Sequence, residues 1–261
     1  MLPSTGEIKK TAKSIMKGKY LPCITVTLIF LFAFIALSFL CDIIASVTML
    51  YIGTFIFVVS FLLLIFPMFM GVIRYFFRIS DNVTDNPVSI FYYFSDFKTY
   101  DRLFGFTIRI FLKLTFSGFA LLLPYALLKL FSSTFIYDKL NVLTPTWTPI
   151  LSTVGDFALG IAIILYIIIN LKYYLSFHLF ASSDYITGSD AVKYSVIISR
   201  RTKADFLFLI FSMIGYILLS VFLVSILFVF PLFVSVYVVH SRCAVNQYNE
   251  TINNLKNRSF G

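Results

Sequence analysis

Five uncharged runs constrain this chain more than any other feature of its sequence. They cover residues 21–41, 43–73, 114–128, 157–171 and 206–239, and are 21, 31, 15, 15 and 34 residues long. An α-helix rises about 1.5 Å per residue, so about 20 residues cross a hydrocarbon core of about 30 Å. Of all residues, 59% are hydrophobic and 13% are charged, which is too few charges to cover a water-soluble domain. The sequence therefore predicts an all-α integral membrane protein.

The runs predict a six-span transmembrane helical bundle that forms one membrane domain over residues 1–261. The expected spans lie near residues 21–41, 54–73, 114–131, 154–171, 206–222 and 225–241. The third run is short, but Lys113 and Lys129 can extend it because their ammonium groups reach the headgroup region. The last run would be about 51 Å long as one straight helix, so we interpret it as a hairpin that breaks near residues 221–225.

The basic residues fix the expected orientation of these spans. With six spans, 19 of the 21 Lys and Arg residues fall on one side, and Lys129 and Lys139 fall on the other. Cytoplasmic segments are enriched in Lys and Arg, so both termini are expected in the cytoplasm. This topology accounts for the net charge of +9, and we do not expect nucleic-acid binding. The first run is too long for the apolar core of a signal peptide, and we expect it to stay attached.

An internal repeat organises the chain into three units. Phe66-Pro67-Met68-Phe69 and Phe230-Pro231-Leu232-Phe233 end two inward-returning spans. A basic amphipathic segment precedes each outward span, over residues 8–20, 89–113 and 190–203. We therefore expect three helical hairpins, each preceded by a cytoplasmic surface helix.

The starts and faces of the surface segments can also be predicted. Asn86-Pro87 is typical of the start of the second segment, and Ser189 could cap the third. In the third segment, apolar residues at 191, 194, 197 and 198 share one helical face. That face can pack on lipid or on the bundle.

The order of these features resembles a bacterial integral-membrane family known as domain of unknown function 975. The resemblance covers nearly the whole chain. Its motifs are the basic start at residues 8–13, Phe66-Pro67-Met68-Phe69-Met70-Gly71 before Arg74 and Tyr75, the segment Phe91–Phe97, Tyr173-Tyr174-Leu175-Ser176, residues 191–199 and Phe230-Pro231. The resemblance implies a six-helix membrane fold and brings no established activity.

Two sets of polar residues are poor matches to catalytic sites. Tyr137-Asp138 with Gly155-Asp156 departs from the pattern of an intramembrane aspartyl protease, because Thr153 stands where a glycine is expected and both aspartates border an outer loop. Ser117-Gly118 with His178 or His240 would be a serine-histidine pair, but the expected depths of these residues differ. We expect no catalytic, cofactor or metal site.

Polar residues within the expected spans are sparse. Asn170, Ser117 and Gly118 are the best candidates for interhelical contacts, since small and amide side chains let membrane helices approach and bond. Cys23, Cys41 and Cys243 lie in or beside spans and are expected to be free thiols.

Basic residues next to the spans are candidates for contacts with anionic lipid. They are Lys98, Arg102, Lys193, Arg200, Arg201 and Lys203. We therefore expect a non-enzymatic protein of a bacterial plasma membrane that acts through lipid or protein contacts, as an accessory, scaffold or protective factor. The alternative is a transporter or the permease subunit of an exporter, with an ATPase subunit as partner. An intramembrane enzyme is the least favoured class.

Overall fold

The structure is a computed structural model and describes residues 2–47, 50–83, 85–133, 146–220 and 223–259. Within these residues every regular element is helical, which confirms the all-α prediction. Five helical stretches are long and apolar enough to cross a membrane: Tyr20–Val47, Tyr51–Ser80, Phe97–Ser132, Thr148–Ser182 and Ser225–Asn254. The chain divides into unit 1, residues 1–107 and 173–261, and unit 2, residues 108–172.

Helix α1 (Thr5–Met16) opens unit 1 with a capping box. The Ser4 hydroxyl accepts a hydrogen bond from the Glu7 amide, and the Glu7 carboxylate accepts one from the Ser4 amide at 2.7 Å. Gly18 then adopts φ +80°, a left-handed conformation that ends the helix and lets the chain turn. Helix α2 (Tyr20–Val47) follows.

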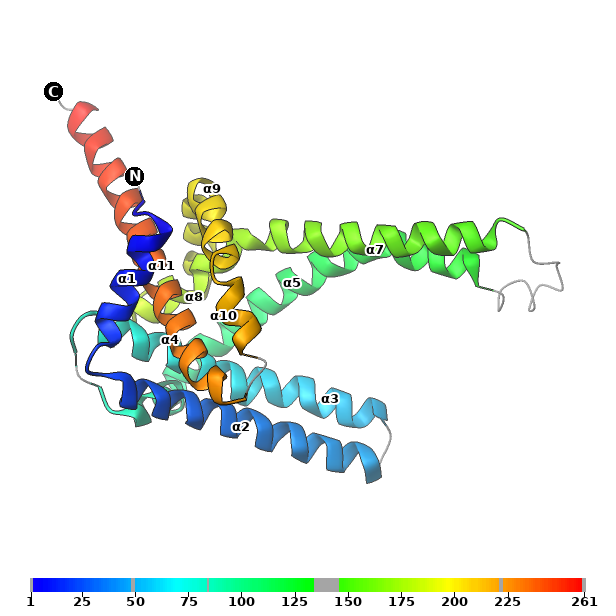
Figure 1. Ribbon diagram of the computed structural model, residues 1–261, viewed down its shortest axis with the longest axis horizontal. Coiled ribbons are helices and arrows are strands. Elements are labelled where there is room, and N and C mark those ends of the chain that lie inside the picture. Colours follow the sequence, from blue (N-terminus) through cyan, green and yellow to red (C-terminus); the bar gives the residue numbers. More distant parts are fainter. Residues whose placement is uncertain (1, 48–49, 84, 134–145, 221–222, 260–261) are drawn as a thin grey trace. The chain divides into compact units, whose positions relative to one another are not determined.

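Helix α3 (Leu50–Ser60) returns beside α2, as Figure 1 shows. It continues through a π-helical turn, η1 (Phe61–Ile65), into α4 (Phe66–Ser80). Pro67 cannot donate a hydrogen bond to the carbonyl of Leu63, four residues earlier, and its ring displaces that carbonyl. The Tyr100 hydroxyl donates to the Leu63 oxygen instead, at 2.9 Å.

The segment after α4 differs from the expected amphipathic helix at residues 89–113. Asn86 caps a 3-10 helix, η2 (Pro87–Phe94), as its sequence indicated. This helix crosses α4 at Gly71, where an added Cβ would lie 1.9 Å from the Ile90 carbonyl oxygen. Helix α5 (Phe97–Ser132) then continues without interruption through the basic residues into the expected third span.

Unit 2 is the hairpin formed by α5 from residue 108 onward and by α7 (Thr148–Asn170), visible in Figure 1. Within it, Pro124 lies inside α5. The 3-10 turn η3 (Leu171–Tyr173) leads from α7 to α8 (Tyr174–Ser182).

The third surface segment is longer than expected. Helix α9 (Gly188–Phe211) runs past residue 206, where a separate span was predicted to begin, and breaks at Ser212 and Met213 before α10 (Ile214–Leu219). Helix α11 (Leu223–Ser259) completes the chain. The predicted turn at residues 221–225 lies partly outside the described residues. Thus residues 206–222 do not form one of the five candidate spans.

One local prediction for α9 was wrong, and another holds only in part. Its N-cap is Thr187, whose hydroxyl accepts from the Asp190 amide at 3.2 Å, and not Ser189. Its buried face includes Ala191, Ser195, Ile198 and Thr202, whereas Tyr194 and Ile197 are exposed. Small side chains occupy much of this buried face because α9 packs closely on α8 and α11.

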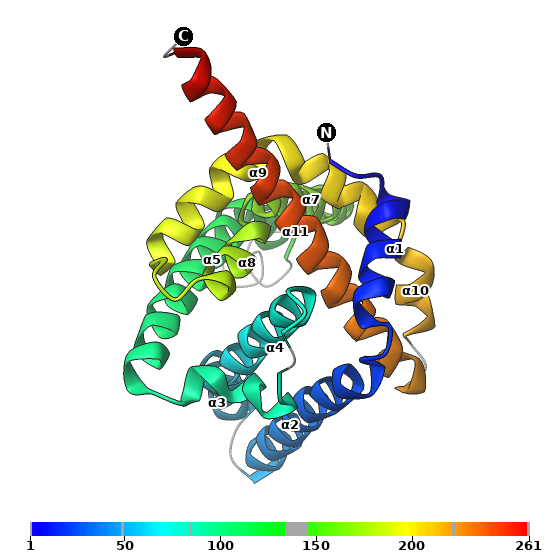
Figure 2. The ribbon, with the colours of Figure 1, turned by 90° about the vertical axis from the view of Figure 1, so that its left-hand side faces the viewer.

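The two Phe-Pro motifs of the sequence repeat meet in unit 1. Phe30 of α2 stacks on Phe230 of α11, with ring centroids 5.6 Å apart, and contacts Phe69 of α4 at 6.1 Å. Figure 2 shows α2, α4 and α11 from the side where α1 lies along α11. The motifs therefore contribute to one aromatic core.

Candidate functional site

The candidate lipid-binding residues of the sequence fall into two groups in the structure. Lys98 and four residues of α9 are exposed and have no ion pair within the described part of the chain. We call the four residues of α9 the basic face: Lys193, Arg200, Arg201 and Lys203. Arg102 belongs to the second group, because its charge has partners inside unit 1.

The basic face is exposed because the opposite side of α9 is fixed in the core. Ala191, Ser195, Ile198 and Thr202 follow one another at helical spacing and are all buried. The hydroxyl groups of Thr202 and Tyr174 lie 2.8 Å apart and share a hydrogen bond. The four basic side chains therefore lie outside the buried face, and those of Arg200 and Arg201 lie on the edge of α9 that borders α11.

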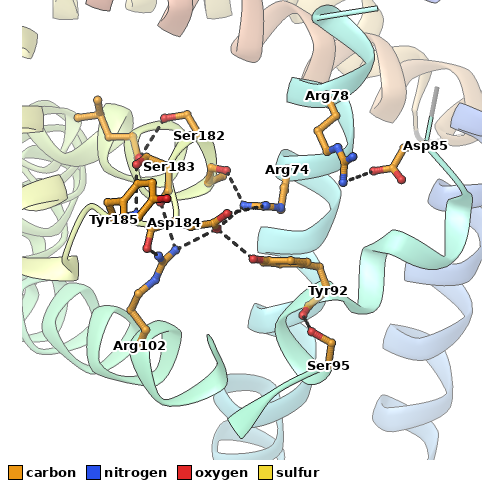
Figure 3. Close-up of polar contacts among 12 residues, drawn as sticks. Arg74, Arg78, Asp85, Tyr92, Ser95, Arg102, Ser182, Ser183, Asp184 and Tyr185 are labelled. Atoms are coloured by element: carbon orange, nitrogen blue, oxygen red, sulfur yellow. Dashed lines mark hydrogen bonds and ion pairs between the residues drawn. The ribbon is translucent and has the colours of Figure 1, made fainter. Parts of the chain in front are cut away.

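Arg102 lies in an arginine cluster formed by Arg74, Tyr92, Arg102 and Asp184, shown in Figure 3. Arg74 Nη1 and Nη2 donate to the two Asp184 carboxylate oxygens at 2.9 and 3.1 Å. The Arg74 guanidinium also lies over the Tyr92 ring, 3.7 Å from its centroid, and the Tyr92 hydroxyl donates to Asp184 Oδ1 at 3.0 Å. Such two-pronged pairing is stronger and more directional than a single contact.

Arg102 completes the cluster from α5. It donates to the Asp184 backbone carbonyl and to the Ser183 carbonyl, the latter at 3.2 Å. Its guanidinium lies 4.6 Å from the centroid of the Phe180 ring, and its Nη2 lies 3.8 Å from Asp184 Oδ1. Arg102 thus joins α5 to the segment after α8, and its charge is engaged within the protein.

The cluster changes the ionisation of Asp184. Partial burial alone would raise the pKa of this carboxyl, but the hydrogen bonds and positive charge of Arg74, with smaller effects of Tyr92 and Arg102, lower the pKa below its ordinary value. The carboxylate is therefore charged at neutral pH and offsets two nearby cations.

Two lysines of α1 are held by the break between α9 and α10. Lys9 Nζ donates to the Ser212 carbonyl at 2.6 Å, and Lys13 Nζ lies 5.7 Å from the centroid of the Tyr216 ring. A cation at the end of a helix stabilises its free carbonyl groups. These lysines therefore fix α1 against the end of α9.

In unit 2, the predicted interhelical residues join α5 to α7. Ser117 Oγ donates to Asn170 Oδ1 at 3.0 Å, and the Asn170 amide donates to the Tyr166 carbonyl at 2.9 Å. A Cβ added to Gly118 would lie 3.2 Å from the Tyr166 ring, so the glycine permits this close packing. Near the other end of the hairpin, Lys129 pairs with Asp156 at 2.9 Å.

The described residues of the two poorly matching catalytic patterns contact other side chains of the protein, through an ion pair or through ring contacts. Asp138 lies outside the described residues, and Asp156 has the lysine partner just given. His178 and His240 are buried in unit 1, where the His178 ring lies against Phe77 and the His240 ring against Phe206. No group of three His, Cys, Asp or Glu side chains among the described residues is arranged to hold a metal ion.

Asp184 and Tyr92 were not predicted from the sequence. A signal was present, because Asp184 is the sole acidic residue between Asp156 and Asp190, and Lys172 is the sole Lys or Arg in the same stretch. Its partners could not be named, because Arg74 is 110 residues away in the chain. No protein family, curated protein or solved structure matches the chain.

Proposed function

We propose that this chain is a multi-pass protein of a bacterial plasma membrane that acts without catalysis, through contacts between the basic face and anionic lipids. It has six spans with both termini in the cytoplasm, the sixth arising from a hairpin within residues 206–239. It belongs with the family known as domain of unknown function 975, which the order of its motifs resembles. Its proposed role is that of an accessory, scaffold or protective factor.

This proposal rests on one observation: some arginines of unit 1 form ion pairs with aspartates, and those of the basic face do not. Arg74, Arg78, Arg102 and Arg242 each pair with an aspartate of the same unit, whereas Arg200 and Arg201 have no ion pair among the described residues. Topology alone requires positive charge near a span and does not require it to be left unpaired. The exposed charges of α9 are thus free to meet lipid phosphates.

The contribution of the basic face to the free energy of lipid binding follows from the number of its charges. Each basic residue near an anionic surface contributes about 1 kcal/mol, so the four residues of the basic face would contribute about 4 kcal/mol together. That corresponds to roughly a thousandfold preference for anionic over neutral lipid. Tyr194, exposed on the same helix, can lie at headgroup depth with its ring on the apolar side.

The test is the composition of lipid retained when the full chain is purified in mild detergent. Wild-type protein should be enriched in anionic phospholipid relative to the membrane it came from. The triple variant Arg200→Gln, Arg201→Gln, Lys203→Gln should lose this enrichment. The matched control Arg200→Lys, Arg201→Lys, Lys203→Arg keeps every charge and should retain it. Equal anionic lipid in the Gln variant and the wild type would overturn the proposal, and a co-purifying ATPase subunit would favour the permease alternative.

A further inference from the structure

A pocket of about 350 Å³ lies between α9 and α11 in unit 1, beside the basic face. Arg200 and Arg201 line it from α9, and Gln247, Tyr248 and Thr251 line it from α11. Apolar side chains complete the walls, among them Ile197 and Ile252. The pocket thus combines two cations, uncharged hydrogen-bonding groups and an apolar lining.

The polar groups on the α11 wall have unused hydrogen-bonding capacity. The side chains of Gln247 and Tyr248 are half-buried, and neither has a hydrogen-bond partner among the described residues. Thr251 donates to the Gln247 carbonyl at 2.8 Å, which leaves the lone pairs of its hydroxyl oxygen available. Half-buried amides and phenols without a protein partner are satisfied by water or by a ligand.

The charge of the pocket selects the kind of ligand. No carboxylate is among the described residues that line it, whereas other arginines of unit 1 are neutralised by aspartates. Guanidinium groups bind phosphate through two parallel hydrogen bonds. An amide and a phenol can donate to further phosphate oxygens or to the hydroxyl groups of a polar headgroup.

The position of the pocket selects the source of the phosphate. In the proposed topology the last span ends near residue 241, and the α11 residues that line the pocket, from Ala244 to Ile252, lie three to eleven residues further on, about 4.5 to 16.5 Å along the helix. The polar layer of a bilayer extends about 5 to 8 Å beyond the hydrocarbon core on each side. The end of the pocket at Ala244 therefore lies at headgroup depth, and the rest of the pocket extends from there toward the cytoplasm, so a lipid headgroup can enter it from the bilayer surface.

We propose that the pocket between α9 and α11 is a specific site for the phosphodiester headgroup of an anionic phospholipid. The inference rests on the proposed function and adds to it a defined stoichiometric site. Arg200 and Arg201 hold the phosphate, while Gln247 and Tyr248 bind the headgroup from the other wall.

The test uses variants that alter the pocket without altering charge. The full chain in neutral detergent is titrated with short-chain phosphatidylglycerol, and binding is followed by calorimetry. The variants Gln247→Leu and Thr251→Phe, which remove a donor and fill the pocket, should each weaken binding by about tenfold, or about 1.4 kcal/mol. The control Asn246→Leu changes the neighbouring exposed residue outside the pocket and should leave the affinity unchanged.

The outcomes distinguish a lipid site in the pocket from lipid contacts of the basic face alone. If the triple Gln variant of the basic face loses anionic lipid but the two pocket variants bind as tightly as wild type, the pocket proposal is overturned and the basic face stands. Inorganic phosphate and glycerol phosphate serve as further probes. Either one binding as tightly as the lipid would overturn the assignment to a lipid. Circular dichroism and gel filtration of each variant verify that weakened binding does not reflect unfolding.

Discussion

At the scale of single residues, Asp184 lies where two arginines from different helices converge. The substitution Asp184→Asn removes the charged acceptor of the Arg74 pair and leaves two cations close together. We expect a loss of about 1 kcal/mol, because Asp184 is half exposed and water screens the pair. Thermal unfolding in detergent measures this loss, and the exposed Asp205→Asn is a control that should change little.

The lowered pKa of Asp184 also predicts a pH dependence. A carboxyl with a lower pKa in the folded state stabilises the fold above its unfolded pKa of about 3.9. This stabilisation should be complete at pH 7 and be lost as the pH falls below about 4 and passes through the folded pKa. In an acid titration, Asp184→Asn should show a smaller loss of stability than wild type, and identical curves would contradict the assignment.

Gly71 gives a steric prediction at the same scale. In Gly71→Ala, the new methyl group would lie 1.9 Å from the Ile90 carbonyl oxygen, so the backbone of η2 would have to move. We expect destabilisation of about 3 kcal/mol or more, at the upper end of overpacking effects. Gly105→Ala is the control, because nothing lies within 4 Å of its added Cβ. That change should be neutral or stabilise α5 by up to about 1 kcal/mol.

At the scale of elements, the π-helical turn before Pro67 depends on a residue from another helix. In Tyr100→Phe the Leu63 carbonyl loses its hydrogen-bond donor, while the aromatic ring and its packing on Phe104 are kept. Hydrogen bonds of this kind contribute about 0.6 to 1.5 kcal/mol. We expect a loss of that size in thermal unfolding, together with faster amide exchange around residues 61–66. Pro67→Ala combined with Tyr100→Phe should recover part of it, since an alanine at this position has the backbone N–H that proline lacks and can donate to the same carbonyl.

At the scale of the whole molecule, the proposed six-span topology predicts which positions each side of the membrane exposes. In a chain with its three native cysteines replaced by Ala, a cysteine introduced by Ser225→Cys should react with an impermeant reagent from outside the cell. The change Asn253→Cys should give a cysteine that reacts only after the cytoplasm is opened, because Arg242 and the basic residues after it favour the cytoplasm. Labelling of Asn253→Cys in intact cells would exclude the sixth span.

The sequence by itself determined the class of the molecule and most of its helices. Uncharged runs long enough to cross a bilayer form apolar helices, because backbone N–H and C=O groups in lipid must form their hydrogen bonds within the segment. Local chemistry also located the start of η2 at Asn86-Pro87, where the cap is formed by neighbouring residues. These features depend on residues close together in the chain.

Only the tertiary structure decided which basic residues are paired and where the last helices break. Arg102 and Arg200 look alike in the sequence, and they differ because Asp184 and Phe180 surround the first, while the second is exposed and has no ion pair among the described residues. The buried face of α9 was likewise set by close packing on α8 and α11, which favoured small residues over the most apolar ones. The contacts of Arg102 and Arg74 with Asp184 join residues 82 and 110 positions apart, and they depend on how the helices cross. The hydrophobic periodicity of a single helix does not predict that crossing.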